Sequence, residues 1–225
     1  MAKQYKLIFM GTPEFAVLSL QTLINNPSFD IKAVVTQPDK PIGRQGTPQP
    51  SPIKQLATQN NLDVITPEKI RHNTEFIAQL KSINPDVIVV VAYGKILPQE
   101  ILDIPKHGIV NVHASLLPQY RGASPITASI LNDDEHTGVT LMKMELAMDT
   151  GPIIVKSNPI KIEDTDTTAS LTQKLMQVGA NLLDQYLTQY LDGKIKPTPQ
   201  DNTKATNVKI IHKEDGKIDW KIQQK

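Results

Sequence analysis

Asp86-Val87-Ile88-Val89-Val90-Val91-Ala92 is an almost unbroken run of β-branched side chains near the middle of the chain. Such a run is typical of a central parallel strand whose two faces are both covered by helices. The next strand is expected at residues 109–113. Earlier strand patterns fall at residues 7–10, 31–36 and 64–65, and helix patterns fall between them, from Gly11 onward and at residues 52–60 and 74–82. This alternation predicts an α/β fold with a doubly wound, mostly parallel, Rossmann-like sheet.

The turn Gly11-Thr12-Pro13-Glu14 is expected to start the first helix. Thr12 suits the N-cap position, and Pro13 suits the first helical turn, where the missing N–H is not needed. The G-x-G-x-x-G pattern of dinucleotide-binding turns is absent, so we interpret this turn as a structural helix start rather than a dinucleotide-binding turn.

The second part of the chain has a different pattern. Residues 137–145 and 153–162 predict two longer antiparallel strands joined by the turn Asp149-Thr150-Gly151. Residues 167–190 predict a long amphipathic helix with leucines along one side. The fold should therefore combine the parallel sheet with an antiparallel extension and a long C-terminal helix. Residues 37–51, rich in Pro, Gly and Gln, are expected to form a long functional loop.

Composition limits the possible function classes. The 225 residues are 39% hydrophobic and 21% charged, which is ordinary for a globular protein. Because there is no cysteine, disulfides and thiolate metal sites are excluded, which fits a reducing cytoplasm. No signal-peptide core and no apolar run of about 20 residues is present, so no membrane contact is expected. The net charge of +1 gives no global field for nucleic acid, so any such contact must be local.

Asn111 and His113 lie two residues apart at the end of an expected strand. Their side chains should share one face at the carboxyl edge of the sheet, where open α/β sheets bind ligands. An amide donates to an oxygen that becomes negative, and a neutral imidazole accepts a proton, so the pair suits carbonyl chemistry. Alternatively, the two side chains simply cap the strand. The polar loop that follows favours catalysis.

Three motifs resemble the active-site set of formyltransferases that use 10-formyltetrahydrofolate. They are Asn111-x-His113, Ser115-Leu116-Leu117-Pro118-x-Tyr120-Arg121-Gly122-Ala123 and Asp149-Thr150-Gly151. Further stretches resemble the members that act on methionyl-tRNA: Gly11-Thr12-Pro13-Glu14-Phe15, Gln37-Pro38-Asp39-Lys40-Pro41-x-Gly43-Arg44, Pro50-Ser51-Pro52-x-Lys54, Val91-Ala92-Tyr93-Gly94-Lys95-Ile96-Leu97-Pro98 and Ile218-Asp219-Trp220.

The resemblance implies a bacterial, cytoplasmic enzyme of translation initiation. It would transfer a formyl group from 10-formyltetrahydrofolate to the α-amino group of methionyl-initiator tRNA through a tetrahedral intermediate. The catalytic residues would be Asn111, His113 and Asp149. Asn111 would stabilise the oxyanion. His113 would act as general base, or as a cation that shares the oxyanion. Asp149 would orient His113, favour its cation or position a water.

The resemblance also assigns binding residues. Folate contacts are expected from Gly94, Lys95, Ile96, Leu97, Ser115, Leu116, Leu117, Pro118, Leu146, Ala147 and Met148. The acceptor stem of tRNA would meet Arg44, with Lys40 nearby, because arginine grips phosphate with two donors. The Leu117–Pro118 bond is expected to be cis. No metal is expected, and the protein is expected to be a monomer.

Domain boundaries follow the same resemblance. Residues 1–191 would be the catalytic domain, residues 192–206 a linker, and residues 207–225 the truncated start of a C-terminal tRNA-binding domain. The loop after Arg44 reads Gln45-Gly46-Thr47-Pro48-Gln49, where the family often has lysine, so tRNA affinity is open.

Four functions are compatible with these residues. Besides Met-tRNA, the formyl acceptor could be an amino sugar-nucleotide or glycinamide ribonucleotide. Water as acceptor would make the protein a 10-formyltetrahydrofolate hydrolase. A non-catalytic folate- or RNA-binding module is the fourth, but such a module needs no proton shuttle.

Overall fold

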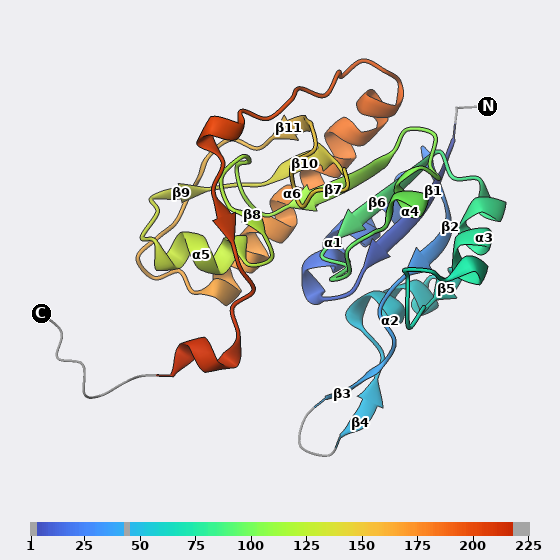
Figure 1. Cartoon of the computed structure of the whole chain (residues 1–225), viewed down its shortest axis with the longest axis horizontal. Helices are drawn as coiled ribbons and strands as arrows, with labels where there is room; N and C mark the ends of the chain where they lie inside the picture. Colours follow the sequence, from blue (N-terminus) through green and yellow to red (C-terminus); the bar gives the residue numbers. More distant parts are fainter. Residues whose placement is uncertain (1–3, 43–45, 218–225) are drawn as a thin grey trace, which may run out of the picture.

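A seven-stranded sheet forms the centre of the computed structural model, which describes residues 4–42 and 46–217 (Figure 1). The strand order is β11-β10-β7-β6-β1-β2-β5. Neighbouring strands from β7 to β5 are parallel, whereas β10 runs antiparallel to both β7 and β11. The bounds are β1 Tyr5–Gly11, β2 Phe29–Val35, β5 Val64–Ile65, β6 Val87–Val91, β7 Ile109–His113, β10 Thr140–Lys143 and β11 Ile153–Lys156. The expected parallel sheet with an antiparallel extension is confirmed.

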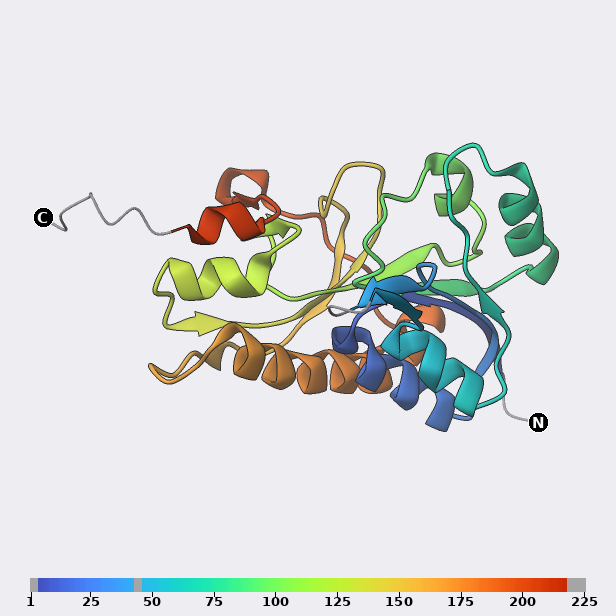
Figure 2. The ribbon, with the colours of Figure 1, turned by 90° about the horizontal axis from the view of Figure 1, so that it is seen from below.

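Helices cover both faces of this sheet (Figure 2). One hydrophobic core packs α1, α2 and α6 against it, and a second packs α3 and α4 against the other face. On β6, Val87, Val89 and Val91 enter the first core, while Ile88 and Val90 enter the second. This double burial explains the β-branched run. The helices are α1 Val17–Asn25, α2 Pro52–Gln59, α3 Thr74–Ile83, α4 Gln99–Leu102, α5 Pro125–Leu131 and α6 Thr168–Leu191.

Helix α6 is the expected long helix, and it packs against β7 in the first core. Thr167 caps it by accepting from the Ser170 N–H at 3.2 Å. Gly179 faces β7, where an added Cβ would lie 2.8 Å from Val112 Cγ1, so the glycine permits close packing of helix and strand. None of the helices in the described part of the chain is long and apolar enough to cross a bilayer.

The start of the first helix differs from expectation. The 3-10 turn η1 Glu14–Ala16 precedes α1, and Pro13 rather than Thr12 stands at its N-cap. The Thr12 hydroxyl instead donates to the Tyr93 carbonyl at 3.1 Å. The predicted cap was wrong because this hydroxyl ties the turn after β1 to the loop after β6.

The expected loop at residues 37–51 contains a small hairpin. Strands β3 Lys40–Ile42 and β4 Thr47–Gln49 pair antiparallel, and the hairpin projects from the body beside α2 (Figure 1). The Pro- and Gly-rich composition concealed this pairing, because exposed two-stranded ribbons carry no apolar alternation.

The two longer strands predicted after residue 136 are each broken. Short strands β9 His136–Thr137 and β12 Ile160–Lys161 pair with each other, and β10 pairs with β11. Gly138 separates β9 from β10, and an added Cβ there would lie 2.5 Å from Leu116 Cδ2. The loop that follows β7, which contains Leu116, therefore packs at the break between β9 and β10.

Packing of α6 predicts the cost of truncating its buried face. Leu183 is fully buried in the first core, so Leu183→Ala should lower the free energy of unfolding by about 2–5 kcal/mol. Gln173→Ala on the exposed face of the same helix should change it by less than about 0.5 kcal/mol. Urea unfolding measures both, and equal effects would contradict the described packing of α6.

Candidate active site

Strand β7 presents Asn111 and His113 on the same face of the sheet. The alternate residues Val110 and Val112 enter the core under α6, while Ile109 joins the core on the side of α3 and α4. Asn111 and His113 are only 9% and 5% exposed. Buried polar groups are usually paired, so the contacts that each of these side chains makes or leaves unmade indicate what it can do.

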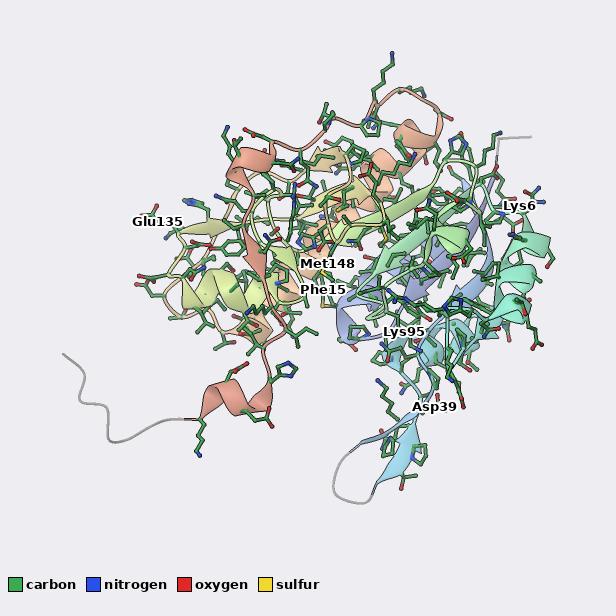
Figure 3. All side chains as sticks on the ribbon, viewed as in Figure 1. Lys6, Phe15, Asp39, Lys95, Glu135 and Met148 are labelled. Atoms are coloured by element: carbon green, nitrogen blue, oxygen red, sulfur yellow. The ribbon has the colours of Figure 1, made fainter. Side chains whose placement is uncertain are left out.

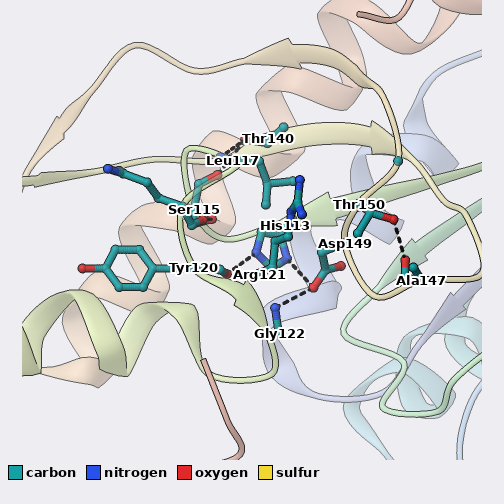
Figure 4. Close-up of polar contacts among 12 residues, drawn as sticks. His113, Ser115, Leu117, Tyr120, Arg121, Gly122, Thr140, Ala147, Asp149 and Thr150 are labelled. Carbon is teal, nitrogen blue, oxygen red and sulfur yellow. Dashed lines mark hydrogen bonds and ion pairs between the residues drawn. The ribbon is translucent and has the colours of Figure 1, made fainter. Parts of the chain in front are cut away.

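Two groups flank the His113 ring (Figure 4). Its Nε2 lies 2.9 Å from the Tyr120 carbonyl oxygen, and its Nδ1 lies 3.7 Å from Asp149 Oδ2. A carbonyl oxygen only accepts, so Nε2 must carry a hydrogen. The neutral ring therefore has its lone pair on Nδ1, on the side of Asp149.

Asp149 reaches His113 from a loop that folds back along β7. Lys143 of β10 pairs with Val110, yet Asp149, six residues later, lies beside His113. Asp149 adopts a left-handed φ of 53°, and its Oδ2 accepts from the Gly122 N–H at 2.8 Å. A Cβ on Gly151 would lie 1.8 Å from the Lys143 carbonyl oxygen, so this glycine lets the loop close on its own strand.

The Asn111 amide is the open group of the site. Within the described residues its side chain makes no hydrogen bond, and its polar atoms are not fully enclosed. An amide with unused N–H donors on the same strand face as the imidazole is available to a ligand oxygen.

Thr140 of β10 holds the loop after β7. Its hydroxyl donates to the Ser115 carbonyl at 2.7 Å and accepts from the Leu117 N–H at 3.1 Å. The Ser115 hydroxyl donates to the Gln119 carbonyl at 2.6 Å. The Leu117–Pro118 bond is cis, as expected. The loop is thus fixed by contacts within the protein, with Leu116 packed against Gly138.

The residues expected to contact folate differ in exposure. The side chains of Leu97 and Leu117 lie in the protein interior, so only their backbone groups can meet a ligand. Ile96, Leu146 and Met148 are exposed at 52%, 62% and 53%. In the view of Figure 3, Met148 lies over the middle of the picture, as an exposed side chain. These exposed apolar side chains are the ones available to cover a ring.

Lys95 lies beside a hollow away from the polar residues of β7. Its Nζ donates to the backbone carbonyls of Pro67 and Glu68. The hollow, of about 420 Å³, is lined by Glu68, Lys69, Ile70, Arg71, Lys95 and Ile96. Of the expected folate residues it contains two, and it contains none of the three expected catalytic residues.

Tyr93 connects this region to the sheet. Its carbonyl accepts from the Gln37 side chain at 2.8 Å, beside Gly94 with its left-handed φ of 79°. Burial raises the pKa of Tyr93 to about 12, so the phenol stays protonated. Burial and a hydrogen bond to Asp134 also raise the pKa of Tyr120.

Among the residues that the structure describes, no group of acidic, cysteine and histidine side chains could hold a metal ion.

Of the two residues expected to contact tRNA, the structure describes Lys40. Lys40 begins β3, and its Nζ donates to Gln37 Oε1 at 2.7 Å. Arg44 lies outside the described residues.

Arg121 and Gln200 were missed as candidate site residues. Arg121 is 7% exposed, and its guanidinium donates to Gln200 Oε1 and Asn202 Oδ1. Gln200 in turn donates to the Asp149 and Gly151 carbonyls. Arg121 belongs to a motif already quoted, and a charged residue inside that motif, between Tyr120 and Gly122, is the signal that could have singled it out. Gln200 carries no such signal.

Comparison of the sequence with known proteins shows which family the chain belongs to. Residues 5–187 match the sequence model of the formyl transferase family. The methionyl-tRNA formyltransferase of Caldicellulosiruptor saccharolyticus is 51% identical over 95% of this chain and 68% of its own length. That of Caldanaerobacter subterraneus is 49% identical over 96% and 69%.

A solved structure shares the fold. An N-formyltransferase from Helicobacter canadensis, in complex with folinic acid and dTDP-3-aminofucose, aligns with a TM-score of 0.69 at 23% identity, over 98% of this chain and 75% of its own. The chain therefore belongs to the formyl transferase family, within its methionyl-tRNA formyltransferase group.

Proposed function

We propose that the chain transfers a formyl group from 10-formyltetrahydrofolate to the α-amino group of methionyl-initiator tRNA. The observation that carries this proposal is the convergence of Asn111, His113 and Asp149 on one sheet face, at the carboxyl end of β7. Membership of the family supports formyl transfer. The folinic acid of the Helicobacter structure supports a folate donor.

Asn111 acts on the formyl oxygen. When the amine attacks the formyl carbon, that oxygen becomes negative, and the Asn111 amide donates a hydrogen bond to it. A well-aimed donor of this kind contributes about 10²–10³ in rate.

His113 moves the proton through Nδ1. Because Nε2 is committed to the Tyr120 carbonyl, Nδ1 takes the proton of the attacking nitrogen and returns it to the leaving folate nitrogen. Asp149 Oδ2, 3.7 Å away, stabilises the imidazolium that forms between these steps. A free α-amine has a pKa of about 7.7–8.0, so placement of the neutral amine contributes as well.

Binding uses the surrounding loops. The pterin ring would lie against exposed apolar side chains and backbone groups, which suit a flat ring with polar edges. The proposed folate contacts are Gly94–Leu97, Ser115–Pro118 and Leu146–Met148. Arg44 and Lys40 would meet the tRNA backbone. Residues 1–191 would form the catalytic domain. The proposed linker, residues 192–206, packs back on that domain through Thr198 and Gln200, and residues 207–225 would be the start of a tRNA-binding domain.

Removal of the oxyanion donor gives the first functional prediction. Asn111→Ala should lower kcat by about 10²–10³ while the Kd for the folate stays within about threefold, because the lost bond strengthens only as charge develops. Single-turnover formyl transfer and folate titration measure the two quantities. A matched loss of affinity and rate would make Asn111 a binding residue instead.

Asp149→Asn isolates the carboxylate charge. The amide oxygen can still accept from Gly122, but it no longer stabilises the imidazolium, so kcat should fall by about tenfold or more with KM little changed. Asp103→Asn removes an exposed carboxylate in α4's C-cap and serves as the matched control. If both variants keep wild-type kcat, Asp149 has no role in the proton transfer.

Acceptor specificity is tested by direct competition. The relatives at about half identity favour Met-tRNA, whereas the Helicobacter neighbour shares only the fold. Formyl transfer should be detected with methionyl-initiator tRNA and not with an amino sugar-nucleotide, glycinamide ribonucleotide or water. Product from one of the other acceptors, without any from Met-tRNA, would overturn the proposed specificity.

A further inference from the structure

Residues 198–208, here named the strap, cross back over the site loops. At one end Thr198 exchanges two backbone hydrogen bonds with Ile153 of β11, both at 2.8 Å. At the other end β13 Asn207–Val208 pairs in parallel with β8 Arg121–Gly122, as Figure 1 shows. The strap therefore touches both loops that flank His113.

The first attachment holds the loop of Asp149. Gln200 Nε2 donates to the Asp149 carbonyl at 2.8 Å and to the Gly151 carbonyl at 2.7 Å. Its Oε1 accepts from Arg121 Nε at 3.0 Å and from Nη2 at 2.8 Å. One amide thus joins the buried guanidinium to the backbone on both sides of Thr150.

The second attachment holds the Tyr120 backbone. The Tyr120 N–H donates to Thr206 Oγ1 at 2.8 Å, and the Arg121 N–H donates to the Thr206 carbonyl at 2.8 Å. The Tyr120 carbonyl is the acceptor of His113 Nε2. The strap therefore fixes the group on each side of the imidazole.

Gly122 permits this close approach. Its φ is 118°, and an added Cβ would lie 2.1 Å from the Val208 carbonyl oxygen. Its N–H is also the donor to Asp149 Oδ2. Strap, β8 and Asp149 therefore meet at one residue.

The separation between His113 and Asp149 makes these attachments necessary. At 3.7 Å the two side chains are too far apart for a hydrogen bond, whose N···O distance is about 2.7–3.2 Å. The imidazole does not hold the carboxylate in place. The Gly122 N–H holds Oδ2 of the carboxylate. The bridge from Gln200 holds the backbone that carries Asp149 and joins it to the buried guanidinium of Arg121.

We propose that Gln200 and Arg121 are positioning residues for formyl transfer, acting through the placement of Asp149 and of the Tyr120 carbonyl beside His113. The inference rests on the proposed function for its consequence in rate. A displacement of about 1 Å at a catalytic group can cost about 10² in rate, so loss of the bridge should be visible in kcat.

Two substitutions with the same change of charge separate positioning from electrostatics. Gln200→Glu keeps an acceptor for Arg121 but turns an oxygen toward the Asp149 and Gly151 carbonyls, which repel it. Asn202→Asp adds the same charge beside Arg121 without touching that loop. Gln200→Glu should lower kcat by about tenfold or more with KM within about twofold, and Asn202→Asp should change neither by more than about twofold.

Amide hydrogen exchange at Gly122 reports Asp149 without any substrate. Protection of this N–H should fall by about tenfold or more in Gln200→Glu and stay at the wild-type value in Asn202→Asp, because only the first releases the acceptor carboxylate. Gln200→Met, which is equal in length and uncharged, is the second variant in case the glutamate variant is poorly folded. It should show the same loss of Gly122 protection and of kcat.

The outcomes are distinct. Unchanged kcat and unchanged Gly122 protection in both Gln200 variants would overturn the inference, as would an equal loss of kcat in Asn202→Asp. A fall in kcat with unchanged protection would also overturn it. If the wild-type chain transfers no formyl group to any acceptor, the proposed function fails, while the exchange measurement still decides the placement of Asp149.

Discussion

The hydrogen bond from His113 Nε2 to the Tyr120 carbonyl sets the chemistry of the site. The imidazole is buried, and a buried donor must be paired, so one nitrogen is occupied by structure and only Nδ1 remains for a proton. The acceptor is a backbone atom of a residue with a left-handed φ of 59°, held by the strap. The tautomer of the ring therefore depends on how the chain turns after β7.

The fold could be predicted where burial leaves a local pattern. Strand β6 and helix α6 lie between or against apolar layers, so their periodicity is visible in the sequence. The hairpin β3–β4 is exposed on both faces and has no such pattern. Thr12 fits an N-cap by composition, but its hydroxyl pairs with Tyr93, 81 residues away, and only the folded chain brings that carbonyl near.

The site divides in the same way. Asn111 and His113 share a strand, so their spacing alone places them on one face. Asp149 was found by resemblance, since its arrival at His113 depends on a loop that folds back. Gln200 bonds to residues 49 and 51 positions away, and its Pro-rich surroundings have the composition of a linker. The composition of this segment indicates only its backbone preference. It does not show to which carbonyl groups the Gln200 side chain donates.

The 3.7 Å separation between His113 and Asp149 also bears on the proposed proton transfer. A neutral imidazole with its lone pair toward a carboxylate gains nothing from that contact, whereas an imidazolium is attracted to it. In the proposed reaction, Asp149 would therefore stabilise the ring mainly after the ring has taken a proton. An interaction that strengthens only along the reaction lowers the barrier without tightening the resting state. Backbone contacts, rather than the ring itself, hold the carboxylate at this distance. The carboxylate therefore interacts weakly with the neutral imidazole and more strongly with the imidazolium.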